Sequence, residues 1–185
     1  MRLEALNVEQ VEHIYNERMS IDFPADELRP LNIILSTIEK GMCDCHGLFE
    51  GDELIGYAFL LKRDNSFMLD YLAVSPDHRN KGIGSEVLKM LSEHYADADN
   101  ILLEVEDPDK AENEEEKSLQ SRRRAFYLRN GCTDTGLRMK CFQVPFQILM
   151  IGDGKCRNID GLREMYKSFY RMILPKDIFE RNIEE

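Results

Sequence analysis

The most constraining feature of the sequence is a stretch in which a strand, a basic turn and a glycine-opened helix follow one another. The apolar run 69–74 predicts a strand, and Arg79 and Lys81 lie in the turn after it. Gly82 and Gly84 then open an amphipathic helix. N–H groups at a helix start have no partners inside the helix, and glycines let an anion approach them without a Cβ in the way. The stretch therefore predicts a cradle for an anion, most naturally a pyrophosphate, with a plain glycine-rich turn as the alternative.

Two other phosphate-binding motifs fit this stretch poorly. A Walker A loop requires Gly-x-x-x-x-Gly-Lys-Ser/Thr, which the chain does not contain. A dinucleotide-binding fingerprint would use Gly82 and Gly84, with Glu104 as the acidic residue after the next strand. The third glycine position of the fingerprint is occupied by Val87, however. In that motif the first glycine follows the strand almost directly, whereas here seven residues separate Val74 at the strand end from Gly82. The dinucleotide reading is therefore disfavoured.

The hydrophobic period changes along the chain between helix-like and strand-like spacing. Asn7 and Gln10 form a capping-box pattern ahead of a helical stretch, and two hairpin turns separate three strand-like runs in an antiparallel meander. The expected helices cover about 8–19, 31–38, 82–95, 119–130 and 159–174, and the expected strands cover about 45–49, 54–61, 67–74, 101–105 and two runs around Phe142 and Ile148. The order ααβββαβαββα is mixed α/β and differs from the strict alternation of a doubly wound fold.

Charge and composition exclude several classes of partner. The 185 residues carry 24 Lys and Arg against 35 Asp and Glu, a net charge of −11, which argues against nucleic acid or anionic membranes as partners. No apolar run approaches the ~20 residues of a membrane-spanning helix, and the start does not resemble a signal peptide. The five cysteines give no disulfide framework, and the segment Cys43-Asp44-Cys45-His46 lacks a second Cys/His pair to complete a metal site. We therefore expect a cytoplasmic protein without a metal.

Three blocks of sequence, in this order, resemble the GCN5-related N-acetyltransferase (GNAT) family. They are Leu72-Ala73-Val74-x-Pro76-x-x-Arg79-x-Lys81-Gly82-Ile83-Gly84, Leu103-Glu104-Val105 and Ala125-Phe126-Tyr127-x-x-Asn130-Gly131-Cys132. The resemblance covers about residues 3–150. It implies the GNAT fold, a mixed α/β structure whose mostly antiparallel central sheet splays around a CoA cleft and is flanked by helices. We expect a GNAT domain over 1–151 and a C-terminal helical extension over 152–185, which packs on that domain and either caps the substrate side or forms a homodimer contact.

The resemblance also implies acetyl-CoA as the cosubstrate. The backbone of the strand at Leu72, Ala73 and Val74 would bind the pantetheine arm. Amides of the following loop would hold the pyrophosphate, and its residues are Arg79, Asn80, Lys81, Gly82, Ile83, Gly84 and Ser85. Gln120 and Arg123 stand where the family more commonly has Asn and Ala. Gln120 could keep an amide contact with the pantetheine.

Acetyl transfer to an amine requires a proton acceptor, an oxyanion donor and an acid for the leaving thiolate. The strand N–H near Leu72 or Ala73 could serve the oxyanion. Tyr127 lies at the position where the resembled family often has a tyrosine that protonates the CoA sulfur; a core aromatic is the alternative. Glu104 is the first candidate for the base, because ribosomal-protein N-acetyltransferases of the family carry a glutamate in a matching strand. Asp70 is the competing candidate, and a relay through water, with or without Glu106, also remains open.

Two charged segments flank these residues. Residues 104–117 hold eight acidic residues and two lysines, a local net charge of −6, in what we expect to be a solvated loop or a wall that attracts cationic amines. Arg122, Arg123 and Arg124 point around most of a helix and are expected to form salt bridges with the acidic segment. A contact from one of them to CoA or an acidic substrate is the alternative. The function expected from the whole pattern is N-acetylation of a small, cationic or peptide amine by direct attack on acetyl-CoA. A non-catalytic acyl-CoA sensor and a transferase for longer acyl chains are the alternatives.

Overall fold

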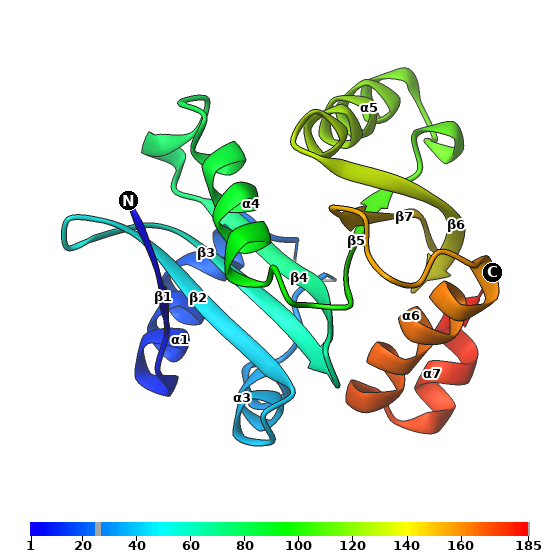
Figure 1. Ribbon diagram of the computed structural model, residues 1–185, viewed down its shortest axis with the longest axis horizontal. Coiled ribbons are helices and arrows are strands. Elements are labelled where there is room, and N and C mark those ends of the chain that lie inside the picture. Colours follow the sequence, from blue (N-terminus) through cyan, green and yellow to red (C-terminus); the bar gives the residue numbers. More distant parts are fainter. Residues whose placement is uncertain (25–26, 185) are drawn as a thin grey trace. The chain divides into compact units, whose positions relative to one another are not determined.

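The computed structural model describes residues 1–24 and 27–184. The chain forms two compact units, one from residues 1–63 and 69–90 and the other from residues 64–68 and from 91 onward. Figure 1 shows the elements of both units. None of the helices within the described residues is long and apolar enough to cross a membrane.

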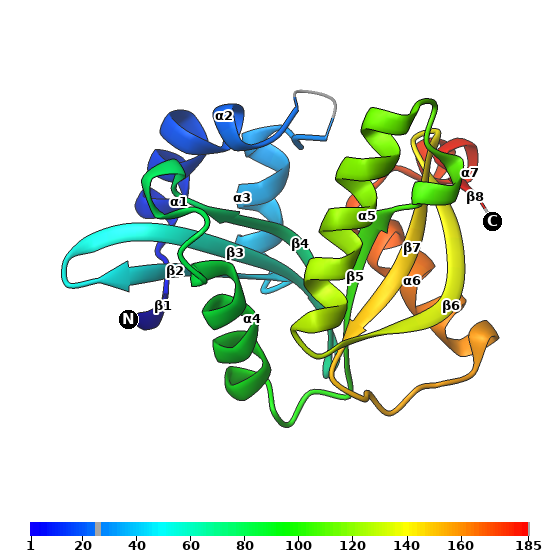
Figure 2. The same cartoon turned by 90° about the horizontal axis from the view of Figure 1, so that it is seen from above.

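The first unit carries four strands in the hydrogen-bonded order β1-β2-β3-β4. Its elements are β1 (Arg2–Ala5), α1 (Val8–Ile14), a π-helical turn (Tyr15–Met19), α2 (Ser20–Asp22), α3 (Leu31–Glu39), β2 (Cys43–Glu50), β3 (Glu53–Arg63), β4 (Ser66–Val74), a 3₁₀ turn (Pro76–His78) and α4 (Ile83–His94). The β1–β2 and β2–β3 pairs are antiparallel. The helices α1 to α3 lie on one face of these strands and α4 on the other, which explains why the middle of β3 is buried on both faces (Figure 2).

The second unit holds the strands β5, β7, β6 and β8 in that order. Its elements are β5 (Asn100–Glu106), a 3₁₀ turn (Pro108–Lys110), α5 (Glu114–Arg129), β6 (Cys132–Cys141), β7 (Val144–Ile151), α6 (Ile159–Ile173), α7 (Lys176–Asn182) and β8 (Ile183–Glu184). The β5–β7, β6–β7 and β6–β8 pairs are antiparallel. Figures 1 and 2 show α5 on one face of β5, β7 and β6, and α6 on the other. The start of β4 and the end of α4 also belong to this unit.

Most expected elements are confirmed, with three additions and two corrections. A strand was expected around Phe142, but β6 ends at Cys141 and Phe142, with φ of 46°, lies in the turn before β7. The capping box of Asn7 and Gln10 is present, and β1, α7 and β8 were not expected. The helix expected over 119–130 begins at Glu114, so the acidic segment is a loop only in part. The Asn113 side chain accepts the Glu116 N–H at 2.9 Å, and the glutamates of the first turn lie at the positive end of the helix dipole. A run of acidic residues therefore starts this helix instead of preventing it.

Candidate functional site

The loop that follows β4 has the backbone expected of an anion cradle. Asn80 and Gly82 both adopt left-handed conformations, with φ of 62° and 81°. The Gly82 carbonyl accepts the N–H groups of Ser85 at 3.0 Å and Glu86 at 3.2 Å, which starts α4. A Cβ on Gly82 would meet no atom within 4 Å, so its positive φ, and not crowding, is what favours glycine there. The exposed Lys81 and Gly82 precede the first-turn N–H groups, which have no partner inside the helix.

The side chain of Arg79 fastens this loop to the first unit. Its Nε donates to the Val74 carbonyl at 3.0 Å, and its Nη2 donates to Asp22 Oδ1 at 2.7 Å. The Asp22 side chain is only 1% exposed and also accepts the Tyr57 hydroxyl at 3.0 Å. Burial, followed by the charge of Asp22, raises the pKa of Tyr57, so this phenol remains a donor. The guanidinium of Arg79 therefore braces the loop, while the amides expected to hold a pyrophosphate follow it along the chain.

The side chains of the last residues of β4 alternate between the two faces of the strand. Ala73 is buried, whereas Leu72 and Val74 on the other face are half-buried. A Cβ on Gly56 of β3 would lie 2.9 Å from the Ala73 carbonyl oxygen, so glycine lets the two strands approach closely. This packing fixes the backbone of the segment expected to bind pantetheine.

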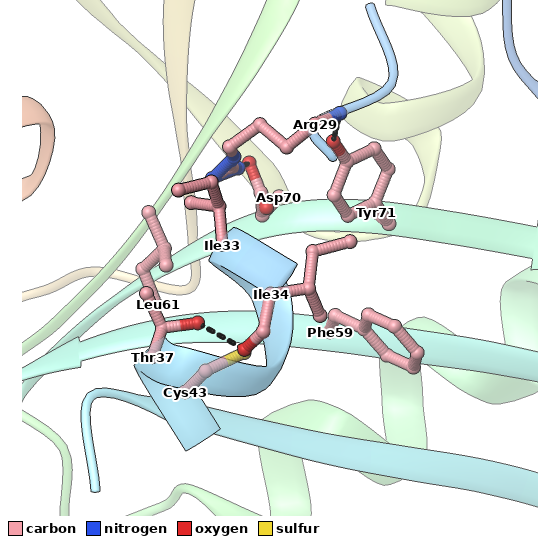
Figure 3. A pocket seen from close by; sticks show the side chains of 9 residues that line it. All are labelled: Arg29, Ile33, Ile34, Thr37, Cys43, Phe59, Leu61, Asp70 and Tyr71. Carbon is pink, nitrogen blue, oxygen red and sulfur yellow. Dashed lines mark hydrogen bonds and ion pairs between the residues drawn. The ribbon is translucent and has the colours of Figure 1, made fainter. Parts of the chain in front are cut away.

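Asp70, one of the two candidate bases, lies in a depression of the first unit (Figure 3). Its carboxylate forms an ion pair with the Arg29 guanidinium, and both side chains are largely buried. The same guanidinium lies 5.4 Å from the centre of the Tyr71 ring. The Tyr71 hydroxyl accepts the Arg29 N–H at 3.0 Å and donates to the Glu27 carbonyl at 3.1 Å. Asp70 is thus connected through Arg29 to Tyr71 in one structural network.

The thiols of Cys43 and Cys45 lie 3.7 Å apart in the same unit, both buried. The hydrogen bond with Cys43, followed by burial, raises the pKa of Cys45 and keeps it a thiol. Within residues 1–24 and 27–184, no group of three or more His, Cys, Asp or Glu side chains is arranged to hold a metal ion.

In the second unit, α5 places three of the singled-out residues on one face. Gln120, Arg123 and Tyr127 are spaced by three and four residues, which aligns them along the helix. The Gln120 Oε1 atom is buried and, within the described part of the chain, has no hydrogen-bond partner. Burial raises the pKa of Tyr127 to about 12, against the opposing charge of Arg123. This face thus combines an unsatisfied acceptor with a phenol that stays protonated.

Glu104, the other candidate base, is held by α6. The hydroxyl of Tyr166 donates to its Oε1, and the hydroxyl of Tyr170 lies 2.9 Å from each carboxylate oxygen. Glu106, the other carboxylate considered for a water relay, forms an ion pair with Arg123 of α5. Both tyrosines lie in the helix that the sequence predicts over 159–174, and both are buried there. No local signal showed that their hydroxyls meet a carboxylate 62 and 66 residues away.

Two arginines of the basic cluster of α5 form side-chain pairs. Arg123 forms the expected salt bridge with the acidic segment, through Glu106. Arg124 instead bonds residues outside that segment, Asp134 at 2.8 Å and Gln147 at 2.6 Å, so the expectation is confirmed only for Arg123. Burial of Asp134 opposes its charge, but hydrogen bonds led by that from Arg138 lower its pKa to about 2. A polar cavity of about 260 Å³ beside this network is lined by Pro108, Asp109, Ser121, Arg124, Arg138 and Gln147.

The mixed α/β arrangement, in which β4, the glycine loop and α4 follow one another, is the GNAT fold. The chain belongs to the acetyltransferase (GNAT) family, whose family model matches residues 8–114. It is therefore a GNAT-type acyltransferase. Among curated proteins, no sequence matches this chain.

Solved structures share the fold at low sequence identity. A GNAT-family protein from Bacteroides thetaiotaomicron is 23% identical with a TM-score of 0.67, over 93% of this chain and 96% of the other. A Bacillus subtilis acetyltransferase in complex with CoA is 16% identical with a TM-score of 0.58, over 82% and 98%. The ribosomal-protein-S18-alanine N-acetyltransferase from Escherichia coli is 16% identical with a TM-score of 0.57, over 83% and 95%.

Proposed function

We propose that this protein transfers the acetyl group of acetyl-CoA to a primary amine of a small cationic molecule or a peptide. The observation that carries the proposal is the face of α5 on which a half-buried Tyr127, whose phenol stays protonated, accompanies the unsatisfied Oε1 of Gln120. Buried acceptors without a partner are rare in folded proteins, so Gln120 Oε1 is suited to accept a hydrogen bond from a ligand. An acyl thioester with an amide-bearing arm supplies partners for both.

Each unit, taken by itself, offers groups suited to a part of acetyl-CoA. Gln120 Oε1 would accept an N–H of the pantetheine arm, which relieves the cost of an unpaired buried acceptor. The backbone of Leu72, Ala73 and Val74 would bind the arm along β4. The amides from Arg79 to Ser85, with Asn80, Lys81, Gly82, Ile83 and Gly84 between them, would hold the pyrophosphate at the start of α4. In this assignment the GNAT domain spans 1–151, and 152–185 is its helical extension.

Proton transfers in the reaction are assigned to two side chains of the second unit. Acetyl-CoA supplies the activated acyl carbon; a C–N bond forms to the amine while the C–S bond breaks. Glu104 takes the proton that the amine loses, directly or through one water. Tyr127 gives a proton to the departing sulfur, and its raised pKa keeps that proton in place at neutral pH. Asp70 is the weaker choice for the base because Arg29 already neutralises its charge.

A non-catalytic acyl-CoA sensor is the competing function. A sensor would need the loop and Gln120 but neither a carboxylate nor a phenol in the acyl-transfer positions. The proposal therefore predicts turnover, and binding alone would support the sensor.

The test is release of free thiol from acetyl-CoA in the presence of polyamines, aminoglycosides, amino acids and peptides, with mass spectrometry of the products. We expect a mass increase of one acetyl group on at least one amine. Gln120→Ala should raise the KM for acetyl-CoA about 10-fold, as loss of a buried hydrogen bond predicts. The matched control is Leu119→Ala, an exposed neighbour on the same helix. Tight binding of acetyl-CoA without turnover on any amine would reject the proposal.

A further inference from the structure

The helix α6 brings two tyrosine hydroxyls to a single carboxylate of β5. Both hydroxyls donate to Glu104, and the bond from Tyr170 is shared between Oε1 and Oε2 at 2.9 Å each. The two rings lie 5.1 Å apart at 51°, so they pack against each other as well. Glu104 is thus contacted from α6 by two neutral donors. Figure 1 shows α6 beside the strands of the second unit.

The positions of these hydroxyls are fixed by packing. Tyr166 and Tyr170 are four residues apart and therefore share one face of α6. They are 0% and 7% exposed, and Phe169 on the same helix is fully buried. Asn158 caps the helix by accepting the Gly161 N–H at 2.7 Å. Rotation of α6 would remove this apolar face from the core, so the hydroxyls cannot easily leave Glu104.

The hydroxyls of Tyr166 and Tyr170 also stay protonated near neutral pH, so both remain hydrogen-bond donors. Burial, with the nearby charge of Glu104 as the second cause, raises the pKa of both tyrosines well above the usual value. Neither phenol therefore ionises near neutral pH, and neither brings a positive charge that would cancel that of the carboxylate.

We propose that Tyr166 and Tyr170 are positioning residues that hold the Glu104 carboxylate in the orientation needed to take a proton from the amine. The inference rests on the proposed role of Glu104 as the base. It gives the extension 152–185 a part in catalysis, although α6 lies outside the segment matched by the family model. An unrestrained glutamate samples several rotamers, and a displaced base loses rate even when it is present.

Phenylalanine variants separate positioning from packing, because they keep both rings and remove only the hydroxyls. A displacement of about 1 Å at a catalytic group costs up to about 100-fold, so we expect Tyr166→Phe and Tyr170→Phe each to lower kcat about 10-fold. The KM for acetyl-CoA should stay within about 2-fold, since neither tyrosine is expected to bind the cofactor. Ser168→Ala is the control, because it removes a buried hydroxyl of α6 that donates to the Met165 carbonyl within the same helix.

A double-mutant cycle with Glu104→Gln decides whether the tyrosines act through the carboxylate. Glutamine still accepts hydrogen bonds, so this variant keeps the contacts while it removes the base. In that background, we expect Tyr170→Phe to change kcat less than about 2-fold. A full additional 10-fold loss there would overturn the proposal.

The remaining outcomes are distinguishable. If Glu104→Gln lowers kcat strongly and both phenylalanine variants are as active as wild type below their melting temperatures, the tyrosines only anchor α6 and the positioning role is rejected alone. If Glu104→Gln leaves kcat unchanged, the base assignment fails, and the positioning role fails with it. Thiol release by the wild-type protein tests the proposed acetyl transfer independently of either result.

Discussion

Two carboxylates that the sequence offers as alternative bases have different surroundings in the two units. In the first unit, Asp70 forms an ion pair with Arg29, whose guanidinium is permanently charged. In the second unit, Glu104 accepts hydrogen bonds from the neutral phenols of Tyr166 and Tyr170. Arg29 therefore supplies a compensating positive charge to Asp70, whereas the two phenols contribute hydrogen bonds without a charge. The comparison supports Glu104, and not Asp70, as the proposed base.

Replacing each carboxylate by its amide tests this difference with the largest expected effect. General bases contribute about 100-fold or more to rate, so we expect Glu104→Gln to lower kcat by about that factor. Asp70→Asn should leave kcat within about 3-fold but cost about 1–2 kcal/mol of unfolding free energy, between the values for exposed and buried ion pairs. Steady-state rates and urea denaturation measure the two quantities. A larger kcat loss in Asp70→Asn than in Glu104→Gln would reverse the assignment.

Tyr127→Phe extends the test to the proposed acid of the second unit. We expect kcat to fall about 30-fold, within the range for loss of a general acid, while the KM for acetyl-CoA changes little. Because burial raises its pKa to about 12, the phenol keeps its proton through neutral and mildly alkaline pH. The wild-type kcat should therefore show no fall from ionisation of Tyr127 between about pH 7 and 10. Tyr95→Phe, another phenol of the second unit, is the control; equal losses in both variants would remove Tyr127 from the mechanism.

Local sequence signals predict much of this protein, and contacts between distant segments account for what they miss. The glycine loop and the capping box of Asn7 follow from neighbouring residues alone, and the structure contains both. The short edge strands β1 and β8 form only by pairing with β2 and β6, so no local period reveals them. The partners of Arg79 and Glu104 likewise lie 57 and more than 60 residues away. The pattern identifies the residue types of the site, but the fold decides what each side chain contacts.

The ion pair between Arg79 and Asp22 provides a test of a structural carboxylate in the first unit. If Asp22 only orders the cofactor loop, Asp22→Asn should raise the KM for acetyl-CoA about 5-fold and leave kcat unchanged, as loss of a ground-state contact does. Arg79→Met should have the same effect, and the double variant should be no worse than either alone. Tyr57→Phe, which keeps the ion pair between Asp22 and Arg79, is the control. A much larger effect of Arg79→Met would show that its guanidinium contacts the cofactor directly.

The smallest expected effect concerns surface charge. If the acidic start of α5 attracts cationic amines, neutralising Glu114, Glu115 and Glu116 to glutamine should raise the KM for the amine about 2–3-fold at low ionic strength. The increase should vanish near 0.5 M salt, where exposed charges more than a few ångströms apart are screened. The matched control neutralises three exposed acids of the first unit, Glu50, Asp52 and Glu53, at the hairpin where β2 ends and β3 begins. An equal rise in KM from both sets would show a general effect of net charge, whereas no rise from either would leave the first turn of α5 with only its structural role at the helix dipole.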